Sequence, residues 1–277
     1  MELKKSLPIG RAAAAGLMLV LAALVLFPFL WLLLASFKFD KEIIQYPPTL
    51  LPGRITFLQY LKVWDSIPLF SFFVNTVIFA GGVTLLSVLF DSMAGYAFAR
   101  LRFKGKKVLF AIVMVTMMVP FQVIMIPLFV EVFKLGLLNT YAGLILPRAT
   151  SAFGIFMMRS FFVSLPKELE EAARIDGLDE YRIYGRIMLP LCAPAILTLV
   201  VFHLMNNWND LLYPLMLTSA TEMRTLSAGL AMFVGERVIE YGPTLAAAVI
   251  SILPLLAVYL FAQKHFIQGI AATGMKN

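Results

Sequence analysis

The sequence predicts an all-α membrane protein with six transmembrane helices and both termini in the cytoplasm. Three observations lead to this prediction: few charges, long apolar runs, and an uneven distribution of lysine and arginine between the segments that join those runs. Of the 277 residues, 61% are hydrophobic and only 14% are charged, whereas an average soluble protein has roughly 25% charged residues. The net charge of +7 does not indicate nucleic-acid binding, because the basic residues lie beside the apolar runs.

Apolar runs set the number of predicted spans. Crossing a hydrocarbon core of about 30 Å takes roughly 20 apolar residues of α-helix. Four uncharged runs are long enough, namely 12–36, 108–130, 187–209 and 241–263. Two further runs, at about 71–98 and 141–162, contain Asp91 and Arg148 with Arg159 respectively. We count both because unpaired backbone cannot face lipid. The first run exceeds the roughly 7–15 apolar residues of a signal peptide, so we expect it to be retained.

Lysine and arginine predict the orientation. If the N-terminus is cytoplasmic, the inner segments carry about twice as many of these residues as the outer segments, as the positive-inside rule requires. The strongest contribution is RLRFKGKK at 100–107, which has five positive charges and no acid. Six spans then return the C-terminus to the cytoplasm.

One long charged segment, SLPKELEEAARIDGLDEYRIYGRIMLPL at 164–191, lies between the fourth and fifth spans. Its pattern predicts two short helices, the first capped by Ser164 and ended by a left-handed Gly177. The adjacent Ala172 and Ala173 remove side-chain bulk, so another surface can approach the backbone closely. Two interpretations remain open on periodicity alone: an amphipathic helix lying on the membrane, or a docking knob for a soluble partner.

The same segment resembles a known signature. Glu171, Ala172 and Ala173 are followed at the expected spacing by Gly177, and then by ILP-type residues at 187–190. This pattern is similar to the EAA motif of bacterial ABC-importer permeases, which have the MetI-like transmembrane fold. The resemblance implies a coupling helix that fits a cleft on an ATP-hydrolysing subunit. The residues to which it assigns this role are Glu171, Ala172, Ala173, Asp176 and Gly177.

Further stretches narrow the resemblance. The segments WNDLLYPL at 208–215, EYGPTLAAAVISILPLL at 240–256 and FIQGIAATG at 266–274 resemble the carbohydrate-uptake branch and its MalG-like subunits. The resemblance implies a bacterial inner-membrane permease for a sugar or oligosaccharide. Its implied partners are a second homologous permease, an ATP-binding subunit dimer and an extracytoplasmic solute-binding protein. A glycerol-3-phosphate permease of the same machinery remains an alternative.

This family organisation predicts three regions. Residues 1–70 form the first span and the first extracytoplasmic segment. Residues 71–265 form the permease core, with the coupling loop at 164–190. Residues 266–277 form a cytoplasmic tail, and the resemblance implies a second contact with the ATPase at 269–277.

The chain carries no evident catalytic site. It has no G-x-x-x-x-G-K-[ST] phosphate loop, no HExxH pattern and no paired cysteines. We therefore expect ATP and Mg to be bound by partner subunits, with no cofactor or metal on this chain. An ion-driven secondary transporter is a rival of another class, and the EAA-like loop argues against it.

Polar residues inside the spans are candidates for the substrate pathway, because each is costly in hydrocarbon. The densest cluster is Asn206, Asn207, Trp208, Asn209 and Asp210 in the fifth span. It either holds helices together or lines a sugar passage, where amides bind hydroxyls and Trp208 stacks on a sugar face. Further pathway candidates are Asn75 and Arg148, and Arg148 is also expected to neutralise Asp210, cap a helix end or face an anionic solute. For Asp91 and His203 we expect structural, hydrogen-bonded roles.

Overall fold

The computed structural model describes residues 8–231 and 240–274, and within those ranges the chain is helical and contains no strand. It divides into two units, which are described separately below. The first comprises residues 1–67 with 230–252, and the second comprises residues 68–229 with 253–277.

The first unit contains α1 (Pro8–Ala35), α2 (Asp40–Ile43), α3 (Leu58–Ser66) and the start of α15 (Tyr241–Gly274). Helix α1 is apolar, and none of its most apolar window is buried by the rest of the chain. A helix that is hydrophobic on all sides and unburied in its own chain is typical of a membrane span. The prediction of a long apolar helix near the N-terminus is therefore confirmed.

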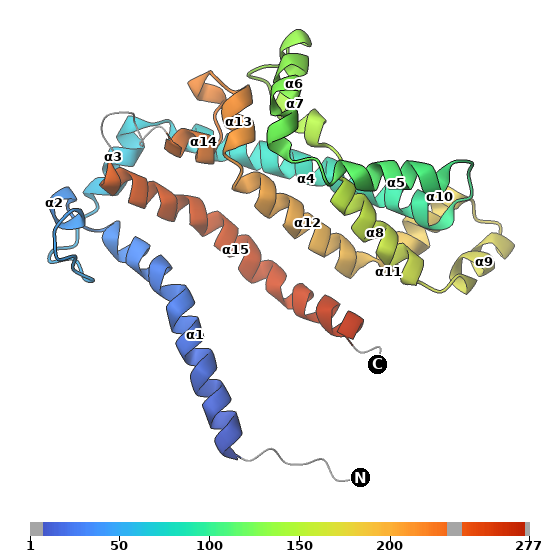
Figure 1. Ribbon diagram of the computed structural model, residues 1–277, viewed down its shortest axis with the longest axis horizontal. Helices are drawn as coiled ribbons and strands as arrows, with labels where there is room; N and C mark the ends of the chain where they lie inside the picture. Colours follow the sequence, from blue (N-terminus) through green and yellow to red (C-terminus); the bar gives the residue numbers. More distant parts are fainter. Residues whose placement is uncertain (1–7, 232–239, 275–277) are drawn as a thin grey trace. The chain divides into compact units, whose positions relative to one another are not determined.

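The second unit is built on α4 (Leu69–Arg100), a helix of 32 residues. In Figure 1, α4 (cyan) lies beside α8 (Ala152–Ser164) and α12 (Ala193–Trp208), and these three helices pack on one another. Their shared apolar core extends to the loop between α8 and α12. The buried residues of this core are Tyr96, Met158, Phe162, Ala173, Ile183, Met188, Cys192, Ala195 and Leu199.

A glycine sets the close approach of α4 and α8. A Cβ atom on Gly95 would lie 2.7 Å from the Cβ of Met158 and 2.9 Å from the backbone nitrogen of Arg159. We expect Gly95→Ala to destabilise the unit by about 1–3 kcal/mol, the usual effect of overpacking. Gly81→Ala on the same helix is the control, since a Cβ there meets nothing within 4 Å. Thermal unfolding of the two variants measures the difference, and equal midpoints would contradict this account.

A second core lies at the other end of α4. It brings α4 together with α6 (Phe121–Lys134), α7 (Tyr141–Ile145) and α13 (Leu212–Leu217). The short helices η3 (Thr221–Met223) and α14 (Leu226–Leu230) follow α13. The buried residues of this core are Phe79, Val83, Val132, Leu144, Tyr213 and Leu217.

Three predicted spans are bent in the structure. The run 108–130 is divided into α5 (Lys106–Thr116) and α6, which meet at 99°. Pro120 precedes α6, and a proline disfavours helical backbone at the residue before it. The expectation of one continuous helix here is wrong, because the proline interrupts the helix although the apolar run continues.

The predicted fifth span is also interrupted. After α10 (Glu180–Ile183), the π-helical turn η2 (Tyr184–Met188) and α11 (Leu189–Leu191), the direction changes by 80° before α12. Pro194 occupies the first turn of α12, where a missing N–H costs nothing. The straight part of this run therefore begins at Ala193 and not at residue 187.

The predicted fourth span starts as α7 and the 3₁₀ turn η1 (Leu146–Arg148) and continues, after a bend of 45°, as α8. By length and composition, two described helices suffice to cross a membrane singly, and up to five do so if each bent pair is one span. The described apolar part of α15, Tyr241–Ala257, is shorter. The number of six spans and the side on which the termini lie stay predictions.

Candidate functional site

The charged loop after α8 folds as two short helices, as predicted. Helix α9 (Glu168–Ile175) is followed by Gly177 at φ +81°, and the N–H of Leu178 donates to the carbonyl of Ala173 at 3.0 Å. This left-handed glycine ends α9 and turns the chain toward α10. Asp179 caps α10 by accepting from the N–H of Arg182 at 2.8 Å.

The predicted cap of the first helix is wrong. Ser164 is the last residue of α8, and its hydroxyl donates to the carbonyl of Phe161 at 2.7 Å. Helix α9 begins only after Lys167, which makes no side-chain cap. Ser164 thus belongs to the preceding helix, where its hydroxyl satisfies one of the carbonyls left free at the helix end.

Helix α9 has a buried side and an exposed side. Ala173 is 3% exposed and packs in the core beside Phe162 and Ile183. Its small size therefore serves the packing of its own chain, which corrects the prediction that both alanines face a partner. Ala172 is exposed, as the prediction requires.

The exposed side of α9 combines a small residue, an apolar residue and acids. Glu171, Ala172 and Asp176 are exposed, and Ile175 is 87% exposed. These positions follow the i, i+1, i+4, i+5 spacing of one helix face. We call Glu171, Ala172, Ile175 and Asp176 the α9 outer face.

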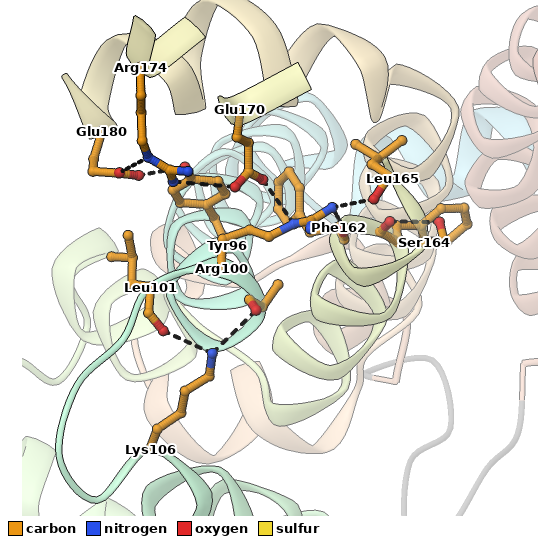
Figure 2. Close-up of polar contacts among 12 residues, drawn as sticks. Tyr96, Arg100, Leu101, Lys106, Phe162, Ser164, Leu165, Glu170, Arg174 and Glu180 are labelled. Atoms are coloured by element: carbon orange, nitrogen blue, oxygen red, sulfur yellow. Dashed lines mark hydrogen bonds and ion pairs between the residues drawn. The ribbon is translucent and has the colours of Figure 1, made fainter. Parts of the chain in front are cut away.

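A buried ion pair joins α9 to α4. The Nε of Arg100 lies 2.9 Å from Oε1 of Glu170, and both side chains are only 5% exposed. The Nη2 of Arg100 also donates to the backbone carbonyls of Phe162 and Leu165 at the end of α8. Figure 2 shows Arg100 between Glu170 and these carbonyls, so one guanidinium connects three elements.

The contacts continue to a second point on α4. Arg174 lies 3.4 Å from Glu170 and donates from Nε to Glu180 at 2.8 Å. The hydroxyl of Tyr96, one turn before Arg100, donates to the other oxygen of Glu180 at 2.9 Å. These five residues form a chain of contacts that leaves α4 at Arg100 and returns to it at Tyr96 (Figure 2). We call them the α4–α9 clamp.

The ionised carboxylate of Glu180 keeps its contact with Arg174 intact at neutral pH. The hydrogen bond from Arg174 holds the pKa of the Glu180 carboxyl below its ordinary value of 4.5. A depressed carboxyl pKa contributes stability above the unfolded-state value, and this contribution is lost as pH falls through the folded-state value. The Arg174–Glu180 contact is therefore fully formed at pH 7.

A second polar cluster lies within the packed helices of the same unit. Asp91 is 0% exposed. Its carboxylate accepts from Thr150 Oγ1 at 2.7 Å, from the Ser151 N–H at 2.8 Å and from Ser151 Oγ at 3.0 Å. The ring Nε2 of His203 lies 3.1 Å from the second oxygen. The structural, hydrogen-bonded roles predicted for Asp91 and His203 are confirmed.

Arg148 forms the ion pair with Asp210 that the sequence suggested. Its Nη1 lies 2.6 Å from Oδ2 of Asp210 and donates to Oδ1 of Asn207 at 3.0 Å. The guanidinium also lies over the rings of Tyr213, at 4.0 Å, and Phe121, at 5.4 Å. The positive charge is therefore balanced by one carboxylate and by two aromatic faces.

Partners of Asp91 and the ion pair of Arg148 border one cavity of about 220 Å³. Of the predicted pathway residues, Arg148 and Asn206 line it, and Asp210 contacts it through Arg148. Asn209 is exposed, and its amide donates to the carbonyl of Met205 at 3.0 Å. The lining residues are Val83, Pro147, Arg148, Thr150, Ser151, Phe202, His203, Asn206 and Asn207.

Two predicted pathway residues lie elsewhere. Asn75 is 3% exposed, and its amide donates to the backbone carbonyls of Glu222 and Arg224 at 2.7 and 2.9 Å. Trp208 is 6% exposed and packs edge-on against Phe73. Asn75 thus holds the segment after α13, and Trp208 packs at the end of α12. Neither side chain lines the cavity.

Sequence reasoning missed two kinds of residue. It used Arg100 only as a topological charge, although its position four residues after Tyr96 places both on one face of α4. It also passed over Thr150 and Ser151, which follow Pro147 at a helix start, where hydroxyls are favoured. Among the described residues, no group of three or more His, Cys, Asp or Glu side chains is arranged to hold a metal.

Comparisons with known proteins agree over most of the chain. Residues 91–272 match the family described as "Binding-protein-dependent transport system inner membrane component". The arabinooligosaccharides transport system permease protein AraQ of Halalkalibacterium halodurans is 37% identical over 260 residues, 93% of each chain. The trehalose/maltose transport system permease protein MalG of Thermococcus litoralis is 33% identical over 264 residues, 94% of each chain.

One solved structure is similar in both fold and sequence. It is a chain of a bacterial ABC transporter involved in the import of the acidic polysaccharide alginate, with a TM-score of 0.83 and 27% identity. The match covers 96% of this chain and 99% of the other.

Proposed function

The chain belongs to the family of binding-protein-dependent transport system inner membrane components, and from this we propose that it is a permease subunit of an ATP-binding-cassette importer for a sugar or oligosaccharide. The observation that carries the proposal is the clamp, because it joins an exposed loop helix to α4, the helix of 32 residues on which the second unit is built. A displacement of α9 would then move α4 directly, because the clamp and not a flexible loop connects the two helices.

The α9 outer face is the proposed coupling surface for an ATP-binding subunit. Ile175 and Ala172 would bury apolar surface in a cleft, while Glu171 and Asp176 meet basic groups at its rim. Gly177 sets the turn that presents this face. Ala173 is left out of the surface because it is buried. Support comes from Ile175, whose apolar side chain is 87% exposed beside the exposed Ala172.

The remaining partners follow from the same proposal. ATP and Mg are bound by a dimer of the ATP-binding subunits, since this sequence contains no phosphate loop. A second, homologous permease supplies the other half of the passage. An extracytoplasmic solute-binding protein delivers the sugar, as the family description of binding-protein-dependent transport suggests.

The cavity beside α12 is the proposed contribution to the sugar passage. Asn206 offers an amide to sugar hydroxyls, and Arg148, Asp210 and Asn209 extend the polar surface around it. Arg148 is already neutralised by Asp210 at 2.6 Å. This pairing favours a neutral sugar over the alternative of glycerol-3-phosphate or a related phosphate ester, which calls for an unpaired cation.

Ala172→Asp tests the coupling surface. The residue is exposed, so the permease should insert and assemble at wild-type levels. A buried, unpaired carboxylate in the docked state should weaken docking by several kcal/mol, which corresponds to a loss of transport of about a hundredfold or more. The measurement is ATP-driven sugar uptake and ATP hydrolysis by the complete complex in proteoliposomes.

The control for this experiment is Lys104→Asp. Lys104 is exposed in the loop before α5 and is not part of the α9 outer face, so it tests whether any added acid on a loop impairs uptake. We expect near-normal transport from this variant. Normal, fully coupled transport by Ala172→Asp would contradict the coupling role of the α9 outer face.

A further inference from the structure

Helix α3 in the first unit has its polar side turned inward. Gln59 is 0% exposed, and its amide donates to the carbonyl of Lys38 at 3.1 Å and to Asp40 at 2.8 Å. Lys62, on the same side, pairs with Asp40 at 2.6 Å. A Cβ on Gly242 would lie 2.3 Å from the side chain of Gln59, so the start of α15 covers this side closely. These contacts set the rotation of α3 about its axis.

The opposite side of α3 is apolar and uncovered. Phe57, Leu58, Leu61 and Trp64 are 64%, 40%, 59% and 63% exposed. Their spacing of i, i+1, i+4 and i+7 places them on one face of the helix. We call these four residues the α3 stripe. An apolar face of this size is rarely left in water, so it marks a surface that a partner or a membrane covers.

The position of α3 along α1 indicates what covers the stripe. The hydroxyls of Ser36 and Tyr60 lie 2.7 Å apart. The ring of Phe37 packs against Phe57 and Tyr60, with centroid distances of 5.4 and 5.3 Å. These contacts attach α3 one or two residues beyond the end of α1. The most apolar part of α1 is unburied, and burial begins only at Ala35, which is 4% exposed. Helix α3 therefore lies beside the end of an apolar helix of spanning length.

We propose that α3 lies in the interfacial layer of the membrane, with the α3 stripe inserted at the boundary between headgroups and acyl chains. The partner is thus a lipid surface, continuous with the one that surrounds α1. Tryptophan is favoured at that depth because its ring is apolar and its N–H is polar. The helix would hold the end of α1 at a set depth, as an interfacial anchor does.

Asp65 distinguishes this partner from a protein. It is exposed, and around the helix axis it lies between Leu58 and Leu61. It forms no ion pair with a described residue. A protein interface over the stripe would bury this carboxylate at a cost of several kcal/mol unless it supplied a cation. The wet headgroup layer keeps it hydrated while Leu61 and Trp64 insert.

Nitroxide spin labels measure the depth directly. Leu61→Cys and Trp64→Cys are labelled one at a time in the complete complex, reconstituted in vesicles of phosphatidylcholine and phosphatidylglycerol. Collisions with oxygen report hydrocarbon, and collisions with a water-soluble nickel chelate report water. Leu24→Cys on α1, at a position 66% exposed, is the hydrocarbon reference, and Lys104→Cys is the water reference. Cys192 is 2% exposed, and the unsubstituted complex gives its background.

The interfacial position predicts an oxygen-to-nickel ratio between those of Leu24 and Lys104 at both α3 positions. A ratio equal to that of Lys104 would mean bare water, and one equal to that of Leu24 would mean full hydrocarbon burial. Low collision rates with both reagents would mean that a protein, such as the second permease, covers the stripe. Each of these three results overturns the proposal. The readout needs no transport, so a failure of this proposal is distinguishable from a failure of sugar uptake.

Discussion

Replacing Arg100 by methionine is expected to lower the free energy of unfolding by about 3–5 kcal/mol, the usual cost of leaving one member of a buried ion pair without its partner. Glu170 would remain at 5% exposure with only Arg174, at 3.4 Å, as a counter-ion. The carbonyls of Phe162 and Leu165 would also lose their common donor. Sugar uptake should be lost together with stability, because α9 would no longer be fixed to α4.

The measurement uses the single cysteine of the chain. Cys192 lies in the core that includes Ala173 of α9 and Tyr96 of α4. In a complex whose other subunits lack cysteine, the temperature at which a thiol dye reacts reports unfolding of this core. The control is Arg182→Met, because Arg182 and Asp179 form an exposed pair, 3.6 Å apart, that should contribute less than about 1 kcal/mol.

A double variant separates charge from packing. In Arg100→Met with Glu170→Met, neither member of the ion pair remains, and such apolar replacements of buried ion pairs are often neutral or stabilising. We expect it to recover much of the thermal stability lost in Arg100→Met. If Arg100→Met instead unfolds at the same temperature as Arg182→Met, the buried pair does not hold the loop.

The features that depend on neighbouring residues alone were predictable from the sequence. The left-handed turn at Gly177 followed from the preference of helix ends for glycine, and the structure has it at φ +81°. The pair of Arg148 and Asp210 followed from the cost of two charges in apolar runs, each of which needs a partner. The helical class followed from the apolar runs themselves.

Other features depend on contacts between distant segments and were not predictable from one run of sequence. Ala172 and Ala173 are identical in type and adjacent, and only the position of the core decides which is buried. The 99° break before α6 shows that Pro120 outweighs a continuous apolar pattern. Arg100 and Glu170 are 70 positions apart in the sequence, and their pairing requires that α4, α8 and α9 meet.

Asp91→Ala is the second substitution expected to have a large effect. The carboxylate lies at the start of α8, where the helix dipole favours a negative charge, and it accepts from Thr150, from Ser151 and from the ring of His203. Alanine would leave these donors without their common acceptor. The expected loss is about 3–5 kcal/mol, since several charge-assisted hydrogen bonds of about 1.5–3 kcal/mol each disappear.

Asp91→Asn is the matched control, because it keeps the shape and removes the charge. Its oxygen can still accept from Thr150 and the Ser151 N–H, while its amide can donate to the Ser151 hydroxyl and, after a change of tautomer, to His203. The space is tight, since a Cβ on Gly154 would lie within 1.9 Å of the carboxylate, so a same-sized side chain is required. We expect Asp91→Asn to unfold between Asp91→Ala and the unsubstituted protein in the Cys192 assay. If alanine and asparagine are equally stable, the cluster does not hold α8 and α12 to α4 through its hydrogen bonds, and the cavity it borders would need another source of rigidity.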